Sequence, residues 1–326
     1  MKKHHLTSAL LAAVLLLSAC GEKEGIFNPG RKLSGVETTL TSIKHVRANE
    51  TDEWVYDTTH IYTNGEQWTW ADNHLANIRY GSDANDELLQ FEYDGDRVIR
   101  ITEQRRDLRI EVKYDGRKVD SIIMYSEDYE VCRATFSHRH GKVSCIEESE
   151  FEPMLDGDAK ALFRRVVGMD MIDESTASVG DRAAQATKDN APNEQWWRTR
   201  WLDLEWDGDN IATAKLYEDS HNEPAATVYT YTYDNAHNPY AGMTFMGLTG
   251  DSPVGQTGRL NANNVVCCKR THSTSSHTLV EEYTYTYSDG WPVSRTHVEV
   301  LSYYLPAFHK YMMVTDSTVT RYTYLN

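Results

Sequence analysis

Basic residues are scarce in this chain of 326 residues. It has 33 lysines and arginines against 49 aspartates and glutamates, which gives a formal net charge of −16. A protein that binds nucleic acid needs a basic face to neutralise phosphates, so we predict no nucleic-acid partner. Long apolar runs are missing as well. The run from Leu10 to Leu17 is too short to cross a bilayer core of ~30 Å as a helix.

The sequence also lacks the short motifs that mark common enzymes. It contains no Gly-x-Ser-x-Gly elbow, no glycine-rich phosphate loop and no His-Glu-x-x-His helix. We therefore predict a protein that is not an enzyme, with no catalytic residue and no cofactor. One alternative stays open, because two carboxylates can act together without any sequence spacing that reveals them.

Two patterns resemble metal sites but favour turns. The Asp-Gly-Asp sequences that begin at Asp94, Asp156 and Asp207 lack the later oxygen ligands and the bidentate carboxylate of a calcium loop. His138 and His140 flank an arginine at an expected turn tip, where zinc would lack a preformed tetrahedral set of ligands. We predict no metal ligand in either pattern.

The segment from Leu17 to Cys20 is typical of the lipobox of a bacterial lipoprotein. A basic start and the apolar run precede it, and the polar residues 21–25 follow it. We predict cleavage before Cys20 and acylation of Cys20, with palmitate among the chains. Two or three chains, at ~0.8 kcal/mol per buried methylene, anchor a protein durably to a membrane. A plain secretory peptide with a coincidental cysteine, or a signal anchor, is the alternative.

The chain therefore divides into a short leader and one large domain. The predicted parts are a signal peptide over residues 1–19, a tether over residues 20–34, and a single β-repeat domain over residues 35–326 with an insertion or linker at residues 152–196. Within the insertion we expect a helix over residues 158–168. Asp158 would cap this helix, and Leu162, Val166 and Met169 would form its apolar stripe.

One phrase recurs along the domain: a strand that ends in an aromatic residue, then Asp with Gly or Asn, then a second strand. The anchor aromatics Trp70, Tyr93, Tyr114 and Phe136 are spaced by 23, 21 and 22 residues. Such a period corresponds to one hairpin per repeat. Asp-Gly favours a type I′ hairpin turn, which needs positive φ at both central residues. The abundant tyrosines, 20 in all, suit strands.

Apolar and polar residues alternate along these strands, which gives the sheet one apolar face. We predict an all-β fold: a long, twisted antiparallel meander of hairpin repeats, curled towards a barrel or shell to bury that face, with a small helical insertion.

The repeats resemble two known groups of proteins. The Tyr-Asp-Gly-Arg-Val type of phrase is similar to the YD repeat of Rhs and teneurin-like β-shells. The segment from Thr230 to Tyr240, then Asn263 to Val265 and Glu282 to Pro292, resembles an uncharacterised family of lipoproteins from Bacteroidota-type bacteria. This resemblance covers roughly residues 35–150 and 200–326. The resemblance implies a surface or periplasmic lipoprotein of unknown ligand, and it implies no set of catalytic residues.

Four cysteines follow Cys20, in a compartment that permits disulfides. Cys132 and Cys145 each lie six residues from the pair His138-Arg139. If a hairpin turns there, the two cysteines face each other and can form a disulfide. The alternative is that all four are reduced and buried.

A cluster of tryptophans is the best candidate for ligand recognition. Trp196, Trp197 and Trp201 follow the insertion and lie among arginines. Strand alternation places Trp201 on the polar face, where an exposed ring can stack on a sugar or hold a peptide. Alternatively, the insertion helix folds back and buries these rings.

These observations predict an outer-membrane or cell-surface lipoprotein, with the periplasmic face left open. Its partners would be the membrane, through Cys20, and a glycan or protein that it binds. We expect a non-catalytic binding or structural module. The alternative is an enzyme or small-ligand carrier that uses the hollow of the curved sheet.

Overall fold

The computed structural model describes eight stretches of the chain: residues 24–81, 87–150, 157–167, 198–218, 220–243, 260–274, 278–305 and 309–325. The predicted signal peptide, Cys20, Trp196, Trp197 and Met169 lie outside these residues. No helix in the described part has the length and apolar character needed to cross a membrane.

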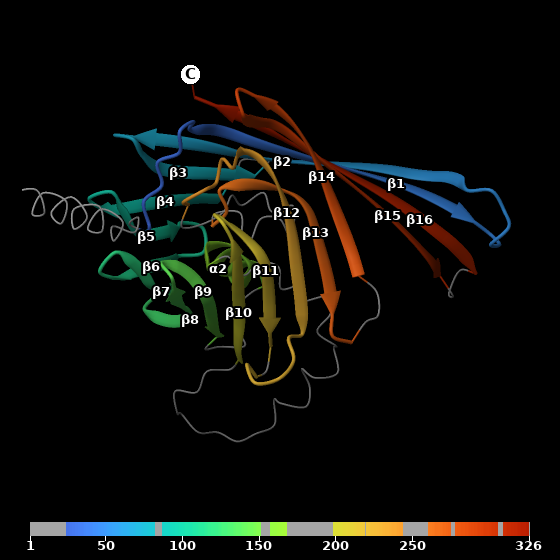
Figure 1. Ribbon diagram of the computed structural model, residues 1–326. Coiled ribbons are helices and arrows are strands. Elements are labelled where there is room, and N and C mark those ends of the chain that lie inside the picture. Colours follow the sequence, from blue (N-terminus) through green and yellow to red (C-terminus); the bar gives the residue numbers. More distant parts are fainter. Residues whose placement is uncertain are drawn as a thin grey trace, which may run out of the picture.

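Sixteen antiparallel strands form a closed barrel in simple up-and-down order (Figure 1). They are β1 (Leu33–Arg47), β2 (Val55–Ala71), β3 (His74–Gly81), β4 (Glu87–Asp94), β5 (Arg97–Glu103), β6 (Leu108–Asp115), β7 (Lys118–Ser126), β8 (Tyr129–Arg139), β9 (Lys142–Glu150), β10 (Arg198–Asp207), β11 (Asn210–Tyr217), β12 (Thr227–His237), β13 (Asn263–His272), β14 (Thr278–Ser288), β15 (Trp291–Leu305) and β16 (Lys310–Tyr324). The last strand pairs with the first, from Leu33 with Tyr324 to Arg47 with Tyr311. The prediction of an all-β meander that curls into a barrel is confirmed.

The hairpin turns that carry the repeat phrase use positive φ, as predicted, but they are not all type I′. At Asp289 and Gly290 both central residues have positive φ, 52° and 77°. At Gly95 and Gly116 the glycine alone has positive φ, 58° and 55°. Glycine is the residue that reaches this region without steric cost. The repeat therefore combines two kinds of tight turn.

Most repeats are joined to a neighbouring strand by their anchor aromatic. A one-residue register shift comes directly before such an anchor, as between Glu92 and Tyr93, whereas in the repeat of Phe136 it comes before His138. Such bulges bend the strand and increase its twist. Phe136 has no hydrogen-bond donor, but six other anchors donate a hydrogen bond of 2.6 to 2.8 Å to a backbone carbonyl of the preceding hairpin or of β1. The pairs are Trp70 to Leu33, Tyr93 to Leu75, Tyr114 to Val98, Trp206 to Val143, Tyr233 to Ile211 and Tyr324 to Pro292.

Apolar side chains fill the inside of the barrel, and the outer side chains of its shorter strands are mainly polar. On β3 to β5, Ile78, Leu89 and Ile101 are fully buried, whereas Gln90 and Glu92 point outward and are exposed. Each buried side chain of this size stabilises the fold by ~1.5–3 kcal/mol. In the part of the chain that the structure describes, the interior of the barrel is therefore a packed hydrophobic core.

The single described helix, α2 (Gly157–Val167), packs against the inner face of the barrel. Leu162, Phe163 and Val166 are buried with the strand residues, which confirms the predicted apolar stripe as far as it is described. Arg164 is buried too, and it forms ion pairs with Glu148 and Glu150 of β9. Buried charges of this kind are tolerated only when they are paired.

Four long strands extend beyond the rest of the barrel as a twisted blade (Figure 1). The blade consists of β1, β2, β15 and β16, paired in the order β2-β1-β16-β15. Its surface carries several exposed apolar side chains: Val55, Tyr56, Ile61, Tyr62, Val298, Val300, Leu301 and Tyr304. The blade points away from the end of the barrel where the repeat turns lie, because β1 begins at those turns with Leu33.

The segment before β1 lies across the turn end of the barrel. This segment, residues 24–32, is called the strap below. Glu24 N–H donates to the Arg117 carbonyl at 2.9 Å, and Phe27 is buried against the rings of Trp68 and Trp70. The predicted tether of residues 20–34 is thus packed on the barrel from Glu24 onward.

Candidate functional site

Trp201, the described member of the tryptophan cluster, lies on the outer face of β10. Its neighbours Arg200 and Leu202 point inward and are buried. Arg200 shares Glu148 and Glu150 with Arg164 of α2, so the helix lies on the opposite face of the strand from Trp201. For Trp201, burial under the helix is excluded. The strand alternation predicted its outward direction correctly.

The ring of Trp201 is half-buried against two side chains from the β11–β12 region. It stacks on His221, with ring centroids 5.6 Å apart and an interplanar angle of 2°. Tyr217 meets the other side of the imidazole edge-on at 4.7 Å. Because Trp201 and Tyr217 are partners across β10 and β11, they hold His221 in a defined position.

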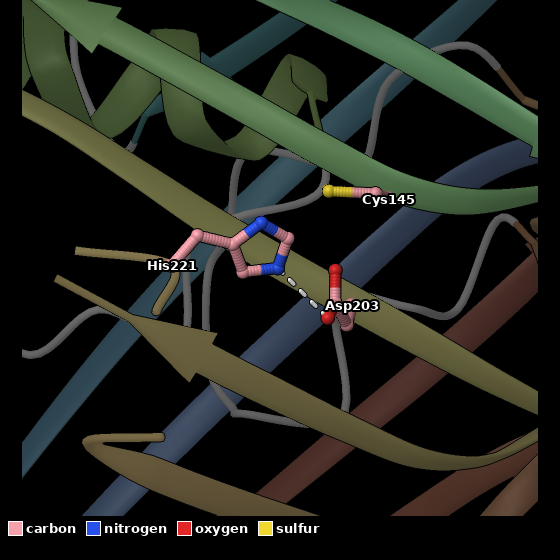
Figure 2. A group of neighbouring side chains, drawn as sticks. All are labelled: Cys145, Asp203 and His221. Atoms are coloured by element: carbon pink, nitrogen blue, oxygen red, sulfur yellow. Dashed lines mark hydrogen bonds and ion pairs between the residues drawn. The ribbon is translucent and has the colours of Figure 1, made fainter. Parts of the chain in front are cut away.

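His221 belongs to a group of three polar side chains on this outer face, with Cys145 and Asp203 (Figure 2). Cys145 on β9 is the direct cross-strand partner of Asp203 on β10. The Nε2 atom of His221 lies 2.9 Å from Oδ2 of Asp203. Burial, together with a hydrogen bond to Asp203, raises the pKa of the Cys145 thiol. A protonated thiol is a poor nucleophile, so this group does not have the character of a catalytic cysteine.

The predicted disulfide between Cys132 and Cys145 is wrong for this structure, in which both cysteines are outside any disulfide. The turn lies at His140-Gly141, two residues later than expected. Cys145 therefore faces Ser137, and Cys132 faces Glu150. Five strand residues at ~3.3 Å each separate the two positions by ~16 Å, far beyond the reach of a disulfide.

His138, which the sequence assigned to a solvated turn, is half-buried beneath the strap. Its Nε2 atom lies 3.0 Å from the Glu24 carboxylate, and the Lys118 ammonium lies 3.0 Å from the same carboxylate. His140 is exposed in the turn with φ of 53°. Glu24 thus joins the strap to β7 and β8 through charged hydrogen bonds.

Beside these charges, a pocket of about 520 Å³ opens at the turn end of the barrel. Its apolar walls come from three distant parts of the chain: Ile26 of the strap, Val143 and Trp206 of the barrel, and Met243 with Leu260 from the segments after β12 and before β13. Its volume falls within the ~300–1,000 Å³ of typical small-molecule sites.

Charged groups surround this pocket in pairs. Lys142 lies 4.7 Å above the centre of the Trp206 ring, and its ammonium is 3.1 Å from the Asp209 carboxylate. Glu24 and Lys118 form the second pair, 3.0 Å apart. The pocket therefore offers an aromatic ring flanked by hydrogen-bonding charges, which is an arrangement suited to holding a small polar molecule with an apolar face.

Sequence reasoning missed this pocket, because its walls lie more than 200 residues apart along the chain. Trp206 does carry the signal of a repeat anchor, since Asp207 and Gly208 follow it directly. No local motif distinguishes the anchors that line the pocket from those that do not.

Comparison with known proteins gives structural likeness only. No protein-family model matches the chain, and no curated protein matches it. A porin-like protein from Bacteroides uniformis is similar over 93% of this chain and 100% of its own, with 11% identity and a TM-score of 0.47. A porin-like protein from Bacteroides vulgatus covers 90% of this chain and 99% of its own, with 9% identity and a TM-score of 0.27. A structure of TcdB2-TccC3-Cdc42 covers 81% of this chain and 16% of that chain, with 9% identity and a TM-score of 0.25. At TM-scores below 0.5, these similarities carry no function to this chain.

Proposed function

We propose that this protein is a non-catalytic lipoprotein of the cell envelope that binds a small carbohydrate-like ligand at the turn end of its barrel. The observation that carries the proposal is the pocket of about 520 Å³ around Trp206, Lys142 and Asp209. The apolar walls, among them Val143 and Met243, would pack against the C–H face of a sugar, while the Lys142 ammonium and the Asp209 carboxylate would bind its hydroxyls.

The filled interior of the barrel favours the turn end, rather than the hollow of the curved sheet, as the binding site. The alternative of an enzyme or carrier that uses the hollow needs an open interior. In the described residues the interior holds α2 and fully buried side chains such as Phe163, Ile101 and Leu202. A ligand therefore has room at the turn end rather than along the axis.

The strap gives the pocket an orientation relative to the membrane. Glu24 packs on the turn end, and the predicted lipid attachment at Cys20 precedes it by four residues. Four residues span at most ~14 Å. The turn end and its pocket would thus face the membrane that holds the lipid, and the blade of β1, β2, β15 and β16 would project away from it.

A glycan array, with a peptide array in parallel, tests the proposal on the mature protein from Gly21 onward. We expect glycan binding that Lys142→Met weakens, because the substitution keeps the length of the side chain and removes its charge. Lys215→Met is the matched control, since Lys215 pairs with Glu205 on the outer face, away from the pocket. Binding of peptides alone, or equal binding by both variants, would reject the proposal.

A further inference from the structure

The outer-face group of Cys145, Asp203 and His221 brings three kinds of donor atom together. In the part of the chain that the structure describes, this is the one set of three His, Cys, Asp or Glu side chains whose possible ligand atoms lie this close together. A thiol sulfur, a carboxylate oxygen and an imidazole nitrogen lie within 4.8 Å of one another (Figure 2). Neighbouring ligands in a tetrahedral zinc site are ~3.5 Å apart, so small side-chain rotations suffice.

Two of the three donors lie on barrel strands, and ring contacts orient the third, His221, which is exposed. Cys145 and Asp203 are paired across β9 and β10, with both side chains on the outer face. His221 comes from the connection between β11 and β12, and the stacked Trp201 and the edge of Tyr217 fix its ring. Second contacts that orient an imidazole are a regular feature of metal sites. The three donors are thus positioned before any ion arrives.

We propose that Cys145, Asp203 and His221 bind a divalent metal ion of intermediate softness, with zinc the best match. This mixture of sulfur, nitrogen and oxygen suits zinc better than magnesium or calcium, which prefer oxygen alone. The ion takes the place of the proton between His221 Nε2 and Asp203 Oδ2. This proton and the Cys145 thiol proton pass to the solvent as the metal–nitrogen and metal–sulfur bonds form, and a proton on Nδ1 keeps the imidazole neutral. Water completes the four ligands.

The surrounding charges favour a cation. Glu147 and Asp203 place negative charge beside Cys145. The nearby Lys215 is bound to Glu205 at 2.5 Å. A simple surface ion pair between Asp203 and His221 would contribute little and needs no thiol opposite it. The bound ion would join β9 and β10 to the β11–β12 connection.

The test is zinc binding to metal-free mature protein, measured by competition with a chromogenic chelator, with cobalt as a spectroscopic substitute. We expect one ion per chain and a cobalt spectrum with a sulfur-to-metal charge-transfer band. Cys145→Ser, Asp203→Asn and His221→Gln should each weaken zinc binding by about 100-fold or more, since loss of outer contacts alone costs ~10–100-fold. Cys267→Ser, at another half-buried cysteine, should leave binding unchanged.

A second measurement tests the proposal without substitutions, in case these variants fail to fold. In the unmodified protein, zinc should slow alkylation of Cys145 and leave that of Cys267 unaffected, as read by mass spectrometry of peptides. Absence of zinc binding, binding without the charge-transfer band, or equal protection of both cysteines would overturn the proposal. None of these outcomes depends on a ligand in the turn-end pocket.

Discussion

Removing one hydroxyl, in Tyr114→Phe, tests whether the anchor aromatics hold successive hairpins together. The Tyr114 hydroxyl donates to the Val98 carbonyl at 2.6 Å, and Gly25 of the strap packs directly on it. The Arg97 guanidinium covers the ring at 4.6 Å. Phenylalanine keeps the ring and its packing, so the substitution removes the hydrogen bond and little else.

The size of the effect follows from the hydrogen bond that is lost. A net hydrogen bond contributes ~0.5–1.5 kcal/mol, and an acceptor left unsatisfied in a half-buried place raises the cost towards ~3 kcal/mol. We expect Tyr114→Phe to lower the free energy of unfolding by ~1–3 kcal/mol, which is a few degrees in melting temperature for a domain of this size. Tyr129→Phe, at a side chain 74% exposed, is the matched control and should change neither quantity.

The same hydroxyl gives a dependence on pH. Burial raises the pKa of Tyr114 to about 12. A tyrosine in the unfolded chain titrates near ~10, so the folded state holds this proton more tightly, and its stabilising effect is complete below pH ~10 and lost as pH rises towards 12. Denaturant unfolding of both proteins from pH 7 to 11.5 measures this. A Tyr114→Phe protein as stable as the unmodified one at pH 7 would refute the role of the anchors.

Three further predictions concern other parts of the chain. Cys20→Ala should move the protein from washed membranes to the soluble fraction, and retention in the pellet would contradict lipid anchoring. Gly116→Val should destabilise the fold by more than ~1 kcal/mol, because Gly116 has φ of 55° with open space around it, so the cost lies in the backbone alone. Gly116→Asn should cost less. Equal melting temperatures for the two variants would contradict this. Trp201→Ala should cost less than the ~3–5 kcal/mol of a fully buried aromatic ring, and acrylamide should quench Trp201 readily, because its ring lies on the outer face. A larger loss of stability would show that the ring is part of the core.

The sequence predicts the repeating hairpins because each depends on local chemistry. Alternation of apolar residues sets the faces of a strand, and Asp-Gly sets the turn. Closure of the barrel depends instead on Leu33 meeting Tyr324, two positions almost the whole chain apart. The twist of the strands makes a curled sheet expected, but no local sequence signal indicates that the first and last strands pair.

Errors in the predicted site have the same origin. A shift of two residues in one turn, together with the one-residue bulge between Ser137 and His138, moved the partner of Cys145 from Cys132 to Ser137, since register fixes every cross-strand neighbour. The strap could not be foreseen either, because Glu24 finds its partners Lys118 and His138 about a hundred residues away. The outward direction of Trp201 was predictable, since alternation along one strand decides it.

The proposed ligand site at the turn end is tested most directly by locating a bound ligand. Crystals of the mature protein soaked with the glycan that binds best on the array should show electron density at the turn end, against Trp206 and beside Lys142 and Met243. Density at Trp201 or along the blade, with the turn-end pocket empty, would contradict the account.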